Sequence, residues 1–127
     1  MNVIHLTHTD VNSDNRILKE LEAISKIDKL NIFAYGIKLT EKKFDVKLKT
    51  KNVNIITFNL FSKKLIYIPK FLRHLFTFIE LFFKIIFKTM SIKPVVIHCH
   101  DTLVLPIGLV LKIQNRNSKL IYDAHEL

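Results

Sequence analysis

Two segments of the chain end in clusters of histidine and carboxylate side chains. The apolar run Pro94–Cys99 leads into His100 and Asp101, and the apolar run Lys119–Tyr122 leads into Asp123, His125 and Glu126. Open α/β sheets bind ligands at the carboxyl ends of their strands, where such groups converge. We therefore expect both clusters to lie at one edge of a parallel sheet and to form a ligand site.

His98 and His100 are separated by one residue, so in a strand both side chains point to one face while Cys99 points to the other. A zinc site at this pair requires a third ligand, for which His125 or Asp123 on the next strand is a candidate. Two other readings stay open: a partly buried pair hydrogen-bonded at the strand end, or a substrate-facing His100 or Asp101.

A polar segment follows the first apolar run, from His8 to Arg16. Free amides at a helix N-terminus attract anions, which makes Asp14 and Arg16 candidates for substrate binding. Arg16 has an equally good partner in Glu20, one helical turn further on. The segment lacks the glycines of a dinucleotide-binding fingerprint, and the chain carries no P-loop and no C-x-x-C pair.

The elements that must position these residues alternate between strand-like and helix-like patterns. Strands are predicted at 2–8, 30–35, 53–58, 94–99 and 119–122, and amphipathic helices at 16–27 and 103–114. Asn12, Ser13 and Asp14 are available as N-caps of the first helix, and Thr102 is expected to cap the last. Residues 37–51 are predicted to form a loop. This order defines an α/β fold with a parallel sheet in one domain spanning residues 1–127.

The segment 61–90 is strongly apolar, but Arg73, Glu80, Lys84 and Lys88 interrupt it along one narrow stripe. This pattern predicts an amphipathic helix with a wide apolar face and not a membrane span. The face either covers the sheet or contacts an anionic membrane surface. The residues expected to face the membrane are Phe71, Phe78, Phe82, Lys63, Lys64 and Arg73.

The chain carries 20 Lys and Arg residues against 11 Asp and Glu residues, a net charge of +9. This charge reflects either a lysine-rich surface without a special role or attraction to an anionic partner. A single cysteine, Cys99, and no recognisable signal peptide favour a cytoplasmic protein, with peripheral contact at the inner face of the cell membrane as an added expectation.

Three stretches resemble motifs of the N-terminal domain of GT-B-fold glycosyltransferases, similar to glycosyltransferase family 4. They are 14–20 (DNRILKE), 94–101 (PVVIHCHD) and 120–127 (LIYDAHEL), in the family's order and spacing. The resemblance implies a Rossmann-like half of a two-domain enzyme that moves a sugar from a nucleotide-sugar donor to a polysaccharide or glycolipid acceptor. It implies retaining, metal-independent transfer, with no cofactor beyond the nucleotide-sugar co-substrate.

The resemblance also assigns residues. It places His100 and Asp101 at the reacting sugar, as catalytic residues, and Asp14, Arg16, His98, His125 and Glu126 around the acceptor or donor. The donor-binding C-terminal domain is missing from these residues, so we expect a truncated, incomplete half that is inactive alone and needs that domain as its partner. Two departures are the absence of a glycine-rich first loop and of a glycine after the first helix, where 27–29 reads Ile-Asp-Lys.

Two alternatives belong to other classes. A non-catalytic basic α/β module could dock on anionic membrane lipid, using the phenylalanine-rich segment. A receiver-like domain would use Asp10, Asp101 and Asp123, which match its acidic triad only loosely. Nucleic acid is not expected as a partner, because the aromatic segment is too apolar for a base-stacking platform.

Overall fold

The computed structural model describes residues 1–39 and 51–124, and within them it contains a parallel sheet of five strands in the order β3-β2-β1-β4-β5. The strands are β1 (Asn2–Leu6), β2 (Asn31–Ile37), β3 (Val53–Phe58), β4 (Pro94–Cys99) and β5 (Lys119–Tyr122). This is the Rossmann-like α/β arrangement expected from the sequence. The chain reverses its direction of travel across the sheet between β1 and β4, which is the topological switch point.

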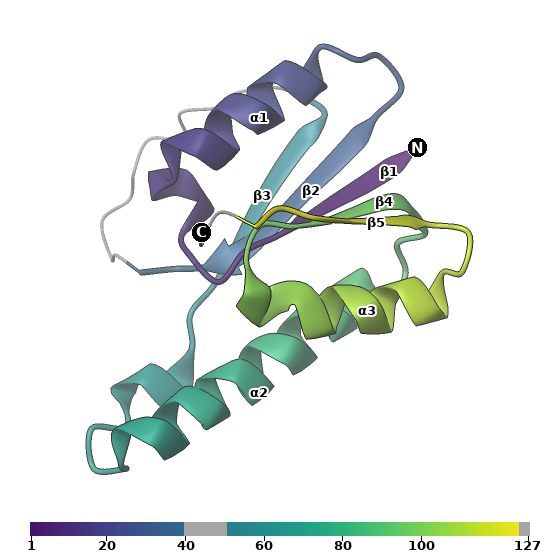
Figure 1. The fold of residues 1–127 in the computed structure, drawn as a ribbon. Helices are drawn as coiled ribbons and strands as arrows, with labels where there is room; N and C mark the ends of the chain where they lie inside the picture. The colour runs from purple at the N-terminus through teal and green to yellow at the C-terminus, as the bar shows by residue number, and fades with distance from the viewer. Residues whose placement is uncertain (40–50, 125–127) are drawn as a thin grey trace.

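Helices cover both faces of the sheet (Figure 1). Helix α1 (Asn15–Ser25) lies on one face, and α2 (Lys70–Thr89) and α3 (Leu105–Gln114) lie on the other. Three short 3-10 turns, η1 (Val11–Ser13), η2 (Phe61–Lys64) and η3 (Thr102–Val104), join these elements. Residues of the predicted loop 37–51 that fall at 40–50 lie outside the described residues.

The sheet separates two apolar cores, because alternate strand residues point to opposite faces. Ile4, Leu6, Ile97 and Cys99 pack with the buried faces of α2 and α3, whereas Ile32 and Ala34 pack with α1. The alternation places His5, His98 and His100 on the α1 face. Cys99 lies in the opposite core, as its spacing from the two histidines predicted.

Two of the differences between predicted and observed element ends have identifiable causes. The second strand does not end at Tyr35 but runs through Gly36 to Ile37, because a glycine there allows close packing: a Cβ at Gly36 would lie 2.5 Å from the backbone oxygen of Thr9. Thr102 does not cap the last helix: α3 begins after Val104, without a side-chain cap, and the preceding η3 is capped by Asp101, whose side chain accepts a hydrogen bond from the Val104 amide at 3.2 Å.

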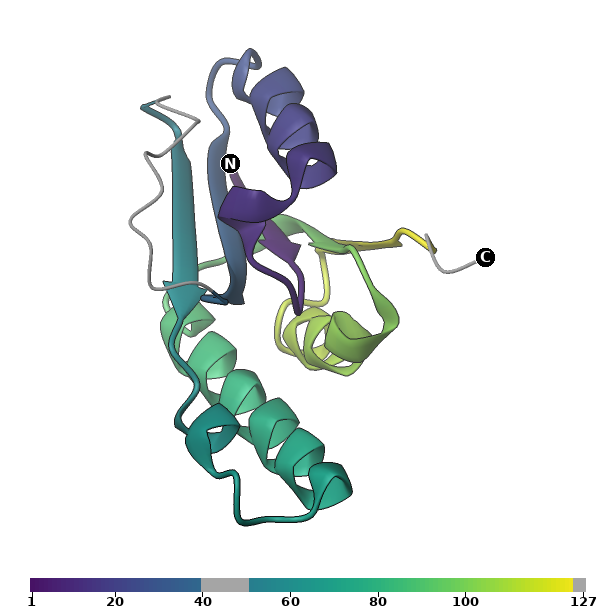
Figure 2. The same ribbon diagram turned by 90° about the vertical axis from the view of Figure 1, so that its left-hand side faces the viewer.

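The phenylalanine-rich segment is a helix only from Lys70 onward, with Pro69 at its N-cap. Residues 61–64 instead form η2, which packs against the polar stripe of α2. Glu80 accepts hydrogen bonds from the Phe61 and Ser62 amides at 2.9 and 3.0 Å, so the stripe holds η2 in place. The N-terminal half of α2 projects beyond the sheet (Figure 2). No helix in the described part of the chain is long and apolar enough to cross a membrane.

Candidate functional site

Three histidines meet at the switch point of the sheet. His5 on β1 and His98 on β4 are partners in the parallel register, and His100 follows β4 directly. The ring centroids of His98 and His100 are 4.1 Å apart, and the His5 ring lies 5.1 and 5.2 Å from them. The expected common face of His98 and His100 is confirmed, and β1 adds a third imidazole that motif spacing does not reveal.

A glutamate from α1 closes the group of three histidines. Glu20 Oε1 lies 2.9 Å from His98 Nδ1, and its Oε2 lies 3.9 Å from His100 Nδ1. His5 Nδ1 and His100 Nε2 share a hydrogen bond of 2.9 Å. Glu20 therefore pairs with the histidines and not with Arg16, the partner considered from the sequence. We call His5, Glu20, His98 and His100 the histidine cluster.

The three histidines of the histidine cluster are buried. His5 and His100 are each 2% exposed and His98 is 8% exposed. Burial, followed by repulsion from the neighbouring imidazoles, lowers the pKa of His5 from 6.5 to about 3. Burial and His98 likewise lower the pKa of His100 to about 4, against a smaller opposing effect of Asp123. Both rings are therefore neutral near pH 7.

Asp101 ties the loops after β1 and β4 together. Its Oδ2 accepts hydrogen bonds from Thr7 Oγ1 at 3.1 Å and from the His8 amide at 2.9 Å, and it lies 2.7 Å from His8 Nδ1. Burial alone would raise the pKa of Asp101, but the His8 and Thr7 contacts outweigh it and leave the pKa below its usual value. In this structure the carboxylate expected to be catalytic accepts hydrogen bonds from its own chain through both oxygens.

The remaining predicted site residues lie around this cluster. Asp14 caps α1 by accepting hydrogen bonds from the Arg16 and Ile17 amides, and Arg16 Nη2 lies 3.7 Å from Asp14 Oδ2. The amide of Asp123 donates to the Cys99 carbonyl at 2.9 Å, so β5 ends beside β4. His125 and Glu126 lie outside the described residues. The predicted cluster after β4 and the described part of the predicted cluster after β5, which ends with Asp123, therefore lie at the same edge of the sheet.

The expected membrane-facing residues divide into two groups. Phe71, Lys63 and Lys64 are exposed, whereas Phe78, Phe82 and Arg73 are partly buried. Phe82 packs against the core shared with α3, which accounts for its burial. The phenylalanines with the largest exposed fractions on α2 are Phe71, Phe76, Phe83 and Phe87.

Sequence reasoning missed three residues of the site: His5, His8 and Glu20. His5 would have been found by aligning β1 beside β4, as the Rossmann strand order requires. Glu20 lies on the helix that crosses this face. His8 contacts Asp101 across 93 positions of sequence, and no local pattern signals that contact.

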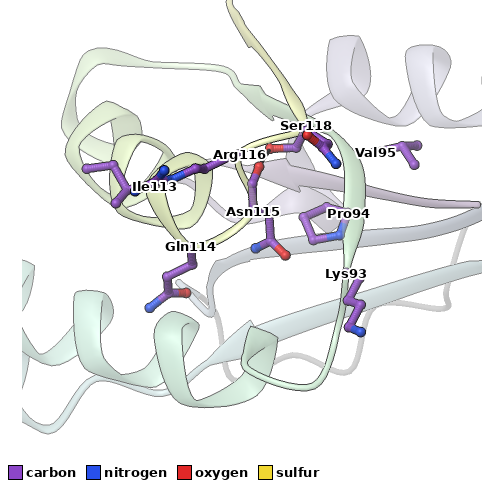
Figure 3. Close-up of a pocket in the computed structure, with 9 residues that line it drawn as sticks. Lys93, Pro94, Val95, Ile113, Gln114, Asn115, Arg116 and Ser118 are labelled. Atoms are coloured by element: carbon purple, nitrogen blue, oxygen red, sulfur yellow. Dashed lines mark hydrogen bonds between the residues drawn. The ribbon is translucent and has the colours of Figure 1, made fainter.

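Two hollows flank the sheet at opposite ends. One, of about 370 Å³, lies beside His8 at the carboxyl edge and is lined on its other sides by residues that include Ile37, His74, Phe78 and Leu81. The other is lined by Lys93 and Pro94 and by the α3–β5 turn, at the amino end of β4 (Figure 3). Ligands of open α/β sheets bind at the carboxyl edge, so the first hollow is the one connected to the site.

The fold and site define a Rossmann-like α/β domain with an ionisable cluster at its switch point. Comparison of the chain with protein-family models, with curated proteins and with solved structures finds no match.

Proposed function

We propose that this chain is the N-terminal, acceptor-binding part of a glycosyltransferase that uses a nucleotide-sugar donor. The observation that carries the proposal is the location of the three motif stretches that resemble family 4. The first begins α1, the second ends at the switch point, and the described part of the third leaves the sheet beside it. All three therefore border one edge, where a ligand of this fold class binds.

The side chains at this edge suit a sugar. Imidazole nitrogens and carboxylate oxygens donate to and accept from sugar hydroxyls, and a guanidinium pairs with phosphate. In the proposed arrangement the transferred sugar lies at the end of β4 that carries the buried His100, and Asp101 fixes the loop that carries His8. Arg16 and Asp14 at the start of α1 contact acceptor or donor phosphate. Donor binding is assigned to a second domain that these 127 residues do not contain.

The apolar hollow beside His8 favours a glycolipid acceptor over a free polysaccharide. Its walls include Phe78, Leu81 and Leu103, and it opens beside the polar loop at the carboxyl edge. An acceptor with an acyl or prenyl tail and a sugar head would place the tail in the hollow and the head at His8 and His100. This arrangement matches the chemistry of a lipid-linked sugar.

Amide-resolved NMR tests the proposal directly. Octyl glucoside below its micelle concentration should shift the resonances of His8, Phe78 and His100, whereas an octyl sulfobetaine should shift Phe78 alone. Equal shifts from both amphiphiles, or none at the carboxyl edge, would refute acceptor binding here. Nucleotide-sugar added to the chain alone should give no transfer, and turnover would contradict assignment of the donor site to a second domain.

A second candidate, a basic module that docks on anionic lipid, is favoured by α2. Exposed apolar residues cover its projecting half, including Phe71 at 78% and Phe76 at 44% exposure, and Tyr67 just before it is fully exposed. Exposed Lys63, Lys64 and Lys70 surround them. Basic residues near an anionic membrane contribute about 1 kcal/mol each, and exposed aromatic side chains add apolar burial.

Co-sedimentation with vesicles tests this second candidate. Binding to phosphatidylglycerol vesicles should exceed binding to phosphatidylcholine vesicles and weaken with salt. The double variant Phe71→Ser/Phe76→Ser should lose binding. The matched control Leu109→Ser/Ile113→Ser removes two exposed apolar side chains from α3 and should keep it. Equal loss in both variants would show that α2 has no special role.

A further inference from the structure

We propose that His5, Glu20, His98 and His100 form a binding site for a divalent transition-metal ion, with Zn²⁺ the best match. The site goes beyond sugar transfer, since the resemblance implies a reaction that needs no metal. The sequence offered only His98 and His100 with a partner from the last strand. The structure supplies two different partners, one from β1 and one from α1.

The ligand atoms converge from separate elements. Each of the four residues offers one nitrogen or oxygen, and these atoms all lie within 4.8 Å of one another. A tetrahedral ion with bonds of about 2.0–2.1 Å holds its ligand atoms roughly 3.4 Å apart. The separations of His98 Nδ1 from Glu20 Oε1 and of His100 Nδ1 from Glu20 Oε2, 2.9 and 3.9 Å, bracket that value. Binding of one ion would draw the four ligand atoms together from separations of up to 4.8 Å.

Hydrogen bonding within the histidine cluster is incomplete without a ligand. Among the residues that the structure describes, His5 Nε2, His98 Nε2 and His100 Nδ1 are buried and have no hydrogen-bond partner. Buried ring nitrogens are normally satisfied, because each unsatisfied group destabilises the fold. A single cation at the centre can engage one nitrogen of each ring, because each residue offers one ligand atom and these atoms lie within 4.8 Å of one another.

The hydrogen bond between His5 and His100 also fits a metal site. One ring must donate and the other accept, and a proton on His100 Nε2 leaves a lone pair on His100 Nδ1, the nitrogen that faces Glu20. Histidines that bind metals commonly have their second nitrogen fixed in this way.

The donor set selects the class of ion. Three imidazoles and one carboxylate suit Zn²⁺, Co²⁺ or Ni²⁺, whereas Mg²⁺ requires a shell of oxygen atoms. Glu20 supplies one negative charge, and Asp123 and Asp14 act on His100 in the same sense, against an opposing effect of Arg16, which lies 3.7 Å from Asp14. The carboxylates therefore compensate part of the charge of a divalent cation in a buried position.

A metal ion bound in the histidine cluster would link α1 to β1 and β4. The cluster is the only group of this kind among the described residues, and its ligands come from three elements, with His5 and His100 separated by 95 positions of sequence. The ion would fix the start of α1, and with it Asp14 and Arg16, relative to the switch point. It would act as a positioning element and not as a reactant.

The test uses the 127-residue chain without an affinity tag. Titration calorimetry with Zn²⁺ and with Co²⁺ should show one saturable site, Co²⁺ should gain visible absorption bands, and Mg²⁺ should not bind. Glu20→Gln changes one partly exposed helix residue, so it leaves the fold intact, and His98→Ala removes an imidazole. Each should weaken Zn²⁺ binding by at least about 10- to 100-fold, the range found even for outer-shell partners.

His74→Ala is the matched control, because His74 is an exposed histidine on α2, away from the histidine cluster. It should leave affinity and stoichiometry unchanged. The proposal is overturned if Zn²⁺ shows no saturable binding, if Glu20→Gln binds as tightly as the parent chain, or if His74→Ala abolishes binding. In those cases the unpaired nitrogens belong to the acceptor site alone. The NMR titration with octyl glucoside tests acceptor binding separately, so its result does not depend on whether Zn²⁺ binds.

Discussion

The substitution Asp101→Asn tests how the loops at the carboxyl edge are held. Asn is isosteric with Asp, so the change removes charge and one acceptor oxygen without creating a cavity. Both carboxylate oxygens of Asp101 accept hydrogen bonds, and the donors belong to Thr7, His8 and Val104. Because an amide has one acceptor oxygen and one donor group, either the His8 amide or the Val104 amide must face an NH₂ group in the variant.

The expected loss follows from these contacts. A buried amide left without an acceptor costs about 1–3 kcal/mol, and the surviving hydrogen bonds to a neutral acceptor are each weaker than those to a carboxylate. We expect the free energy of unfolding to fall by about 3 kcal/mol. Since the folded pKa of Asp101 is depressed, the full difference is present above pH 4 and shrinks as the pH falls through that folded value.

Urea unfolding followed by far-UV circular dichroism at pH 7 measures this difference. Asp28→Asn is the control, because Asp28 lies exposed in the turn after α1 and should change stability by less than about 0.5 kcal/mol. If Asp101→Asn lowers the free energy of unfolding no more than Asp28→Asn does, the Asp101 carboxylate does not hold the two loops together. The same result would favour a substrate-facing role for Asp101.

Three further predictions concern residues outside the histidine cluster. Hydrogen bonds from Ser62 and Phe61, with a contribution from Lys84, outweigh burial and lower the pKa of Glu80 from 4.5 to about 2. That shift corresponds to about 3 kcal/mol, reduced by partial exposure to about 2 kcal/mol. Glu80→Gln should therefore lower stability by that amount above pH 4.5, with the gap closing between pH 4.5 and 2 in urea unfolding. Gly36→Ala should lower the melting temperature strongly, because its Cβ would meet a backbone oxygen at 2.5 Å, and an unchanged melting temperature would contradict that packing. Lys29 adopts a φ of 75°, so Lys29→Gly should raise the free energy of unfolding by about 1 kcal/mol in the same assay, and a loss would show that the side chain contributes more than the backbone strain costs.

The sheet could be predicted from sequence because its strands are short apolar runs with clear ends. Pro94–Cys99 and Lys119–Tyr122 were placed at their observed bounds, since the polar residues that follow them stop the strands. The start of α2 was predicted too early, although Pro69 marks it. Lys29 shows a different limit: it occupies the left-handed position where a glycine was expected, and only the backbone reveals that strain.

The site was harder to predict because its contacts are long-range. The pairing of His98 with His100 depends on alternation within one strand, and local sequence carries that information. The approach of His5 depends on which strands are neighbours, and the approach of Glu20 depends on how α1 crosses the sheet. Glu20 was considered only as a partner for Arg16, because residues four apart on a helix are neighbours regardless of the fold.

Burial of the three imidazoles gives the strongest physical reason to expect a ligand at this edge. Apolar residues at positions 5, 98 and 100 would pack against Ile32 and Ala34 without leaving ring nitrogens unpaired, so stability alone does not explain the histidines. Three buried ring nitrogens without a hydrogen-bond partner are a cost that a bound group can remove. A sugar hydroxyl would contact the histidine cluster from its solvent-facing rim. A metal ion would instead bind the ring nitrogens from the centre of the cluster. Because Glu20 is the member with the most solvent exposure, Glu20→Gln distinguishes the two ligands: it should weaken Zn²⁺ binding by at least about 10- to 100-fold and change contact with a neutral sugar much less.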